Sequence, residues 1–383
     1  MIYLDNAATS WPKPPQVAAA MHRFLDEVGA TPGRSGHRLS VEAGRAVLEA
    51  REAVAELFSV TDPLRVVFTS NATEALNTVL LGLPVSGDHV IASGLEHNSV
   101  MRPLVELRSR GVDFSLLPHA SDGSLDPAEI RKVARPNTVL LVLNHASNVS
   151  GRILPLREVT AVASELGLPI LLDAAQTAGC VPIDMERDGI DFLAFTGHKS
   201  LMGPQGTGGL VISSRIDPRR VRPLKTGGTG SRSEHTTHPD FLPDRFEAGT
   251  PNAVGLAGLA AGLRFVLEKG VAALQRHEER LAARMVQGLS ALDGVALHGI
   301  APAGQRTGVV SFTVHGLPVS EIALRLDEND GVLVRAGLQC APQAHRTLGT
   351  FPHGTVRFSP GPFTTEAQVD AAVAAVARRC LNA

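Results

Sequence analysis

The sequence predicts an α/β fold in which a mostly parallel seven-stranded sheet lies between helices and a smaller α+β domain follows. Short apolar runs of strand length alternate with helical stretches up to about residue 213. Beyond a long alanine-rich helical pattern, this alternation gives way to strands with fewer helices between them. A chain of 383 residues is also long enough to form two lobes, each with its own core.

The first strong helical pattern covers residues 41–58, where apolar side chains recur at helical spacing. Seven apolar runs then predict strands at residues 66–69, 89–92, 114–117, 139–144, 169–173, 192–196 and 209–213. Helical stretches at residues 100–110, 127–134 and 156–166 separate several of them. Strands that alternate with helices form parallel sheets covered on both faces, so the sheet is expected to be mostly parallel.

The C-terminal part begins with a helical pattern from about residue 253 to residue 292, interrupted near Gly270. Strands are expected at residues 295–299, 309–314, 332–335 and 355–359, with helices at residues 320–326 and 366–381. We therefore expect a large domain over residues 13–255. A small α+β domain would contain residues 1–12 and 256–383.

The charge balance excludes some classes of partner. There are 36 basic and 38 acidic residues, so no large electrostatic field points to nucleic acid or to an anionic membrane. No signal peptide and no membrane-spanning apolar run is recognised. Three cysteines, Cys180, Cys340 and Cys380, are far apart and odd in number, which argues against a metal site and a disulfide framework. A cytoplasmic location is expected.

Polar residues that follow the predicted strands are the candidates for a binding site, because ligands bind beyond the carboxyl ends of parallel strands. Asn71, Ala72 and Thr73 open a helix whose free backbone amides can bind a phosphate, although an ordinary helix cap would look the same. His97 follows the next strand, and a lone histidine is more often structural than catalytic. Asp173 ends an apolar strand, where an unpaired carboxylate would be costly.

Lysine is rare in this chain, which narrows the search for a catalytic amine. The five lysines are Lys13, Lys132, Lys199, Lys225 and Lys269. Lys199 follows a predicted strand, among small and polar residues, and precedes a glycine-rich segment at residues 203–209. Lys225, which lies close to two glycines, is its only rival, since the other three fit solvated helix faces or a proline-rich segment.

These residues together meet the needs of one cofactor. Pyridoxal phosphate requires an amine for a Schiff base, a carboxylate that keeps its ring nitrogen protonated, and hydrogen-bond donors around its phosphate. Lys199, Asp173 and the turn at residues 71–73 supply these three groups. The sequence therefore predicts a pyridoxal phosphate enzyme that acts on an amino acid.

A series of motifs extends this prediction over nearly the whole chain. The motifs are at residues 3–9, 73–77, 96–97, 147–149, 173–176, 197–199, 246–252 and 335–341. With them the sequence resembles the class V aminotransferase group of fold-type-I pyridoxal phosphate enzymes, specifically the cysteine desulfurases and selenocysteine lyases. The resemblance implies the fold-type-I architecture and pyridoxal 5'-phosphate as the cofactor.

Carried over by position, the resemblance implies roles around the cofactor. Lys199 would form the Schiff base, Asp173 would face the ring nitrogen, and His97 would stack on the ring and manage protons at the substrate thiol. The other implied contacts are Gln176 at the ring hydroxyl and Thr73, Thr196 and His198 around the phosphate. Asn71 and Ala72, in the same helix-opening turn as Thr73, complete the expected cofactor-binding residues.

The resemblance also implies how substrate and subunits meet. Gly249 and Thr250 would reach the phosphate of the neighbouring subunit, which implies a homodimer with shared active sites. Asn148 and Arg357 would hold the substrate carboxylate, Arg357 being suited to a two-pronged clamp. Arg335 is assigned to the same substrate site.

Cys340 decides which reaction is expected. The resemblance implies a cysteine desulfurase that converts L-cysteine to L-alanine and passes sulfur, as a persulfide on Cys340, to a thiol or protein acceptor. Arg335 precedes Cys340, and His345 and Arg346 follow it, so nearby positive charge would favour the thiolate. The sequence departs from the second group of desulfurases at residues 338–339, Leu-Gln, where that group has two histidines. The short segment at residues 341–349 predicts a fairly fixed cysteine loop.

Other functions stay open at this point. Selenocysteine lyase is the nearest, because selenium leaves more readily than sulfur and would not require Cys340. A class V aminotransferase, or a carbon–sulfur lyase that does not use Cys340, is more distant. Cys340 could also be a buried, inert residue, and the protein could be a cofactor-binding scaffold that has lost turnover.

Overall fold

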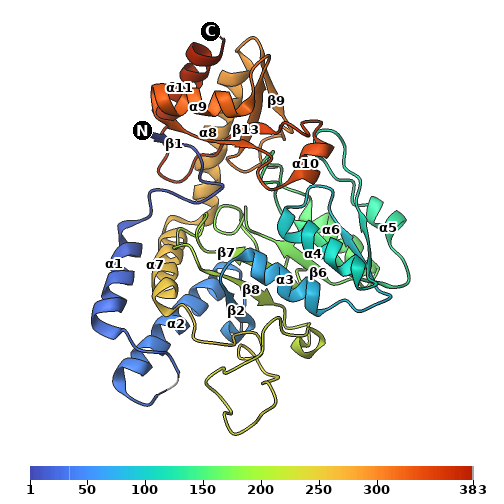
Figure 1. The fold of residues 1–383 in the computed structure, drawn as a ribbon, viewed down its shortest axis with the longest axis vertical. Coiled ribbons are helices and arrows are strands. Elements are labelled where there is room, and N and C mark those ends of the chain that lie inside the picture. The colour runs from blue at the N-terminus through green and yellow to red at the C-terminus, as the bar shows by residue number, and fades with distance from the viewer. Residues whose placement is uncertain (34, 382–383) are drawn as a thin grey trace.

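The computed structural model describes residues 1–33 and 35–381, and it shows a larger α/β part with a smaller α+β part above it (Figure 1). The large sheet has seven strands in the order β2-β8-β7-β6-β5-β3-β4. Only β8 runs antiparallel to its two neighbours, so the predicted mostly parallel sheet is confirmed. The strands are β2 (Val66–Thr69), β3 (His89–Ala92), β4 (Asp113–Leu116), β5 (Thr138–Asn144), β6 (Ile170–Asp173), β7 (Phe192–Thr196) and β8 (Gly208–Ile212).

The strands are apolar on both faces because helices cover both sides of the sheet. Along β5, Leu141 and Leu143 belong to one buried cluster, and Leu140 and Val142 to another, as the two-residue period of a strand requires. The first cluster contains residues from α2 (Arg38–Leu57), α6 (Leu156–Glu165) and α7 (Ala253–Lys269). The second contains residues from α3 (Ala72–Gly82) and α4 (Asn98–Ser109).

A side-chain cap explains where α2 begins, and several shorter helices complete the fold. Helix α2 begins three residues before the predicted start, because the ring of His37 caps it by accepting a hydrogen bond from the Ser40 amide. Helix α1 (Pro15–Arg23), which the sequence analysis did not predict, packs against α7. The remaining short helical segments are η1 (Phe24–Val28), η2 (Pro63–Arg65), α5 (Glu129–Val133), η3 (Pro218–Arg220) and α10 (Pro342–Thr347).

The small part is built on an antiparallel four-stranded sheet in the order β12-β13-β10-β9. Its core includes residues from the helices α8 (Val271–Ser290), α9 (Val319–Asp330) and α11 (Glu366–Val376), which η4 (Ala377–Leu381) follows. The strands are β9 (Val295–His298), β10 (Val310–Val314), β12 (Arg335–Gly337) and β13 (Thr355–Phe358). The single strand expected at residues 332–335 is divided into β11 (Val332–Leu333) and β12.

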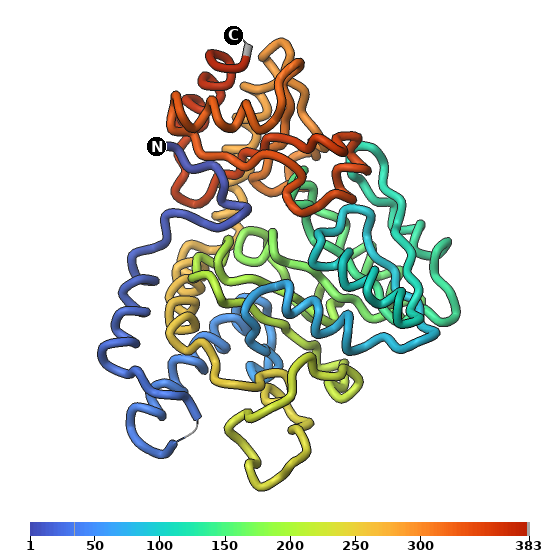
Figure 2. Tube along the Cα trace, viewed as in Figure 1, coloured from blue at the N-terminus to red at the C-terminus, as the bar shows by residue number. Residues whose placement is uncertain are grey.

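The N-terminal strand pairs with a short strand of the small part. Strand β1 (Ile2–Tyr3) pairs in parallel with β11, and from there the chain runs down to α1 (Figure 2). Helix α7 places Leu256, Leu259 and Leu263 in the core of the large sheet, whereas α8 packs in the small part after the break at Gly270. A domain boundary at residue 255 stays a prediction, and this packing favours one nearer Gly270.

Two observations on the described residues bear on the predicted partners. Within residues 1–33 and 35–381, no helix has both the length and the apolar character needed to cross a membrane. The same part of the chain contains no group of three or more histidine, cysteine or acidic side chains arranged to hold a metal ion.

Candidate active site

A cavity of about 230 Å³ lies at the carboxyl ends of the parallel strands. Its walls come from the beginning of α3 and from the segments that follow β3, β5, β6 and β7. The predicted site residues that it brings together are Asn71, Ala72, Thr73, His97, Asn148, Asp173, Gln176, Thr196, His198 and Lys199. Residues from five separate segments thus meet where the topology of the sheet led us to expect a ligand.

The first turn of α3 supplies backbone donors to this cavity. Asn71 caps the helix through its side-chain oxygen, which accepts a hydrogen bond from the amide of Glu74 at 3.0 Å. Within the described residues, the amides of Ala72 and Thr73 have no acceptor. Because the N-terminus of a helix carries a partial positive charge, these amides can hold an anion.

Ser99, which the sequence analysis missed, joins two predicted residues. Its hydroxyl lies 2.7 Å from that of Thr73 and 2.8 Å from His97 Nδ1. The Ser99 amide also donates to His97 Nδ1 at 3.1 Å, so the ring caps α4 and its proton lies on Nε2. Burial, then the positive charges of Lys199 and Arg335, lower the pKa of His97 to about 4. His97 is therefore a neutral imidazole at physiological pH.

Asp173 and Lys199 supply the acid and the amine of the site. Asp173 is the last residue of β6, is 7% exposed, and accepts a hydrogen bond from the amide of Ala175 at 2.9 Å. Burial raises the pKa of its carboxyl group. Burial lowers the pKa of the Lys199 amine to about 8, and the negative charge of Asp173 opposes this shift. The rival, Lys225, lies outside the cavity and forms an ion pair with Glu74 at 2.5 Å.

Two unsatisfied polar atoms test whether a phosphate fits the site. Thr196 Oγ1 and His198 Nδ1 are buried in the cavity wall, and neither has a hydrogen-bond partner among the described residues. A buried polar atom without a partner is costly, which indicates that a ligand completes these two. Burial and two nearby lysines lower the pKa of His198 to about 4, so it faces the site as a neutral ring. The donors, the carboxylate and the amine together fit pyridoxal phosphate.

Gly249 and Thr250 lie away from this cavity. Both are exposed, and they line a second cavity of about 400 Å³ together with residues of α2 and the start of α3. A bond from the Gly249 amide to the carbonyl of Gly228, at 2.9 Å, holds this segment. Their predicted contact with the phosphate of a neighbouring subunit stays a prediction.

Arg357 is fully buried, in a polar network that extends to the N-terminal segment. Its Nη2 donates to Asp5 Oδ1 at 2.7 Å, and its Nη1 donates to the backbone carbonyl of Asn148 at 3.0 Å. The Asn148 side chain donates in turn to the carbonyl of Gln339 at 2.7 Å. The sequence analysis missed both Asp5 and Gln339 as partners, although Asp5 belongs to the first of its motifs.

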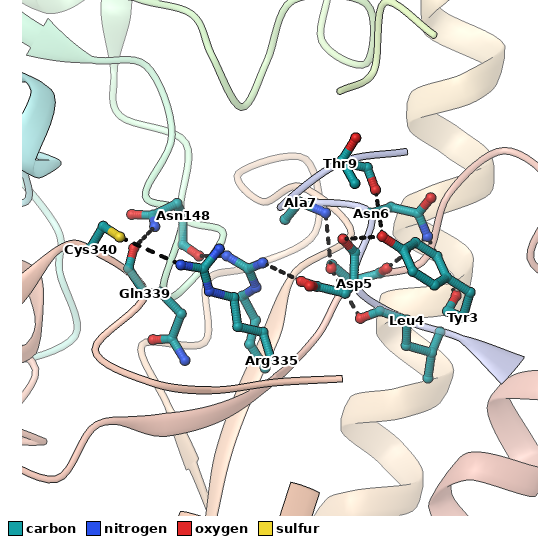
Figure 3. A network of polar contacts seen from close by, with 12 residues as sticks. Tyr3, Leu4, Asp5, Asn6, Ala7, Thr9, Asn148, Arg335, Gln339 and Cys340 are labelled. Carbon is teal, nitrogen blue, oxygen red and sulfur yellow. Dashed lines mark hydrogen bonds and ion pairs between the residues drawn. The ribbon is translucent and has the colours of Figure 1, made fainter. Parts of the chain in front are cut away.

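Cys340 is exposed and lies next to the cavity, which argues against a buried, inert cysteine. It lines a groove of about 500 Å³ that shares Thr73, His97 and Ser99 with the cavity. Arg335 Nη2 donates to Cys340 Sγ at 3.5 Å (Figure 3). The other two cysteines are buried, and burial raises the pKa of the Cys180 thiol.

The prediction that His345 contributes positive charge near Cys340 is wrong. This ring is buried, and its two nitrogens are engaged with Gln339 and Thr350. Burial lowers its pKa to about 4, so it carries no charge near neutral pH. Arg346 stacks over the ring of Phe351 at 4.2 Å.

Glu96 is a further buried acid that the sequence analysis noted only within a motif. Its Oε1 accepts a hydrogen bond from the Asn144 amide at 2.9 Å, while its Oε2 has no partner among the described residues. Burial, then the charge of Asp173, raises the pKa of Glu96 to about 8. It therefore stays largely protonated at pH 7 and adds little negative charge beside Asp173.

Comparisons with known proteins agree with this geometry. The chain is 34% identical over 372 residues to a probable cysteine desulfurase of Methanothermobacter thermautotrophicus, covering 96% of this chain and 92% of the relative. It is 33% identical to a cysteine desulfurase of Haloferax volcanii, covering 91% of this chain and 83% of the relative.

Solved structures and a family model match the chain over most of its length. The apo cysteine desulfurase from Thermococcus onnurineus superposes with a TM-score of 0.92 at 33% identity, covering 100% of this chain and 95% of that one. The S-sulfonic acid form of the cysteine desulfurase CsdA from Escherichia coli gives a TM-score of 0.88 at 29% identity, covering 99% and 94%. The family model described as aminotransferase class-V matches residues 2–372. The chain therefore belongs to the class-V aminotransferase family.

Proposed function

We propose that this protein is a pyridoxal phosphate-dependent cysteine desulfurase that converts L-cysteine to L-alanine and takes up the sulfur on Cys340. One observation carries the proposal: the exposed thiol of Cys340, with Arg335 at 3.5 Å, lies in a groove that shares His97 with the cavity of Lys199 and Asp173. The relatives named cysteine desulfurase support it and favour it over a selenocysteine lyase.

The residues of the cavity would hold the cofactor at three points. Lys199 would bind it covalently through its amine, and Asp173 would pair with its ring nitrogen. The phosphate would be held by the first turn of α3 and by Thr196 and His198, whose buried polar atoms are otherwise unsatisfied. When bound, the cofactor supplies an electron sink for the negative charge that develops at the substrate Cα.

The substrate would be oriented through its carboxylate. Asn148 lines the cavity, and Arg357 and Arg335 provide positive charge next to it. Lys199 is suited to take the proton from the substrate Cα, because an amine with a pKa of about 8 is partly neutral at physiological pH. His97, with its proton on Nε2, can hydrogen-bond the sulfur of the substrate.

The sulfur transfer is balanced without an external oxidant. The Cys340 thiolate attacks the substrate sulfur, so an S–S bond forms and the Cβ–S bond breaks. The electron pair of the broken bond stays with Cβ, which takes up a proton and becomes the methyl group of L-alanine. The sulfur is thereby oxidised and the carbon reduced, and Cys340 leaves the step as a persulfide. A thiol or protein acceptor then removes the outer sulfur by exchange.

The proposal includes a homodimer with shared active sites. Gly249 and Thr250 are exposed and lie outside the cavity of their own chain, in a loop segment between η3 and α7 that protrudes from the large part of the molecule (Figure 2). Such a segment can reach a neighbouring copy. The cytoplasmic location and the absence of nucleic acid and membrane partners stay predictions.

Mass spectrometry of the intact protein after a single turnover with L-cysteine tests the proposal. We expect a mass gain of one sulfur atom that maps to Cys340, with L-alanine released in equal amount. Cys380→Ser is the matched control and should behave like the wild type, because Cys380 is buried in the small part. Alanine release without a persulfide on Cys340 would overturn the proposal. Retained turnover of L-selenocysteine by Cys340→Ala would show that Cys340 serves desulfuration specifically.

A further inference from the structure

Cys340 lies in a tight turn whose backbone is unfavourable for its residues. The turn is closed by a hydrogen bond from the Ala341 amide to the Leu338 carbonyl at 2.8 Å. Its two central residues, Gln339 and Cys340, have φ of +43° and +59°, in the left-handed region that favours glycine. Two consecutive residues with side chains persist in this region only where their surroundings hold them there.

Hydrogen bonds of the Gln339 side chain hold the turn in this conformation. This side chain is 3% exposed, and its Nε2 donates to the backbone carbonyl of Thr355 at 2.8 Å. Because that carbonyl can only accept, the amide orientation is set and Oε1 faces His345 Nε2 at 2.8 Å. The other nitrogen of His345 lies 2.7 Å from the hydroxyl of Thr350. The turn is thus tied to β13 and to the end of α10.

Two further bonds hold the main chain of the turn against the active site. The Asn148 side chain donates to the carbonyl of Gln339 at 2.7 Å, and the Asn98 amide donates to the carbonyl of Cys340 at 2.9 Å. Asn98 is the first residue of α4, directly after His97. Figure 3 shows the bond between Asn148 and Gln339. Because Asn148 lines the cavity, the position of the turn is defined relative to the cavity.

We propose that Gln339 is a positioning residue, which holds the left-handed turn so that the Cys340 sulfur stays at the mouth of the cavity. This inference rests on the proposed desulfurase function. An attacking sulfur must lie close to its target and in line with it, and a displacement of about 1 Å can cost up to about 100-fold in rate. Lys199 and Asp173 lie on other segments, and Asn148 binds the main-chain carbonyl of residue 339, which a change of the side chain retains. We therefore expect the chemistry that precedes the sulfur transfer not to require the Gln339 side chain.

The test compares two rates in the holoenzyme of Gln339→Met, a side chain of similar size that makes neither hydrogen bond. Rapid mixing with L-cysteine gives the first spectral change of the bound cofactor, and quenched samples give the rate of persulfide formation on Cys340. We expect the spectral change to keep its wild-type rate and persulfide formation to fall by roughly 10- to 100-fold. Gln343→Met is the matched control and should leave both rates unchanged, because Gln343 makes no side-chain hydrogen bond within the described residues.

Each outcome decides the inference. Equal slowing of both rates would indicate a merely structural role, and wild-type persulfide formation in Gln339→Met would also overturn the inference. If Gln339→Met does not fold, Thr350→Val removes the outer bond to His345, and it should slow persulfide formation selectively but to a smaller extent. Wild-type protein that forms no persulfide at Cys340 would instead reject the proposed function itself.

Discussion

Titration of the cofactor-free protein changes the charge of Lys199 in a pH range where an ordinary lysine stays fully protonated. Burial lowers the pKa of this amine to about 8 from the usual 10.5. At pH 7 about 10% of the amine would then be neutral, against about 0.03% for an ordinary lysine, a difference of roughly 300-fold. Only the neutral amine attacks the aldehyde of pyridoxal phosphate, so the rate of reconstitution reports this charge directly.

Absorbance after mixing with pyridoxal phosphate, followed between pH 6 and pH 10, measures that rate. The rate should rise about tenfold per pH unit and level off near pH 8. In Asp173→Asn the midpoint should move to lower pH, because the negative charge of Asp173 raises the pKa of Lys199. A rate that continues to rise to pH 10, as for a solvent-exposed lysine, would refute the reasoning.

Three further predictions concern stability and cofactor affinity. Arg51→Leu leaves the carboxylate of Glu247 without its 2.8 Å partner in a largely buried pair, which should cost about 3–5 kcal/mol and lower Tm by roughly 5 °C. Arg45→Leu, which breaks an exposed ion pair, should have almost no effect on Tm. Equal Tm values for Arg51→Leu and Arg45→Leu would contradict this account. Thr196→Val should weaken pyridoxal phosphate binding by about tenfold in a fluorescence titration. It should leave Tm of the cofactor-free protein unchanged, because the hydroxyl has no partner among the described residues. Burial raises the pKa of Glu278 to about 8, so the stability that this group contributes below about pH 4.5 is lost as pH rises through 8. Glu278→Gln should therefore have a Tm a few °C above that of the wild type at pH 8 but not at pH 5. If Tm changed with pH in the same way in both proteins, this explanation would be wrong.

The strands of the large sheet were predictable because each is a short apolar run with polar residues at its ends. All seven expected runs match the observed strands to within one residue at each end, and those of β2, β3 and β7 match without a difference. Helix α1 was missed because Pro15 begins it and a single buried residue, Val17, marks its inner face. The division of the strand at residues 332–335 was missed because β11 pairs with β1, a partner more than 300 residues away in the sequence.

The main residues of the cavity were also predictable from the sequence, because they lie at the ends of recognisable strands. Asp173 ends a predicted strand, Lys199 and His97 each follow one, and a parallel sheet brings the carboxyl ends of its strands to one edge. The neutral state of His345 could not be predicted from the sequence. It depends on burial of the ring, which also contacts Gln339 through a hydrogen bond that forms only in the folded protein.

The sequence by itself therefore determined the class of fold, the candidate nucleophile, and the amine, carboxylate and hydrogen-bond donors that suit the cofactor. The types of residue and their order along the chain are enough to specify these features. Tertiary structure alone decided which residues stabilise them. Asp5 meets Arg357, and Asn148 meets Gln339, across separations of 352 and 191 residues. The first contact joins the N-terminal segment to β13, and the second joins the segment after β5 to the turn after β12. The energies and pKa shifts of such contacts come from burial that no local pattern encodes.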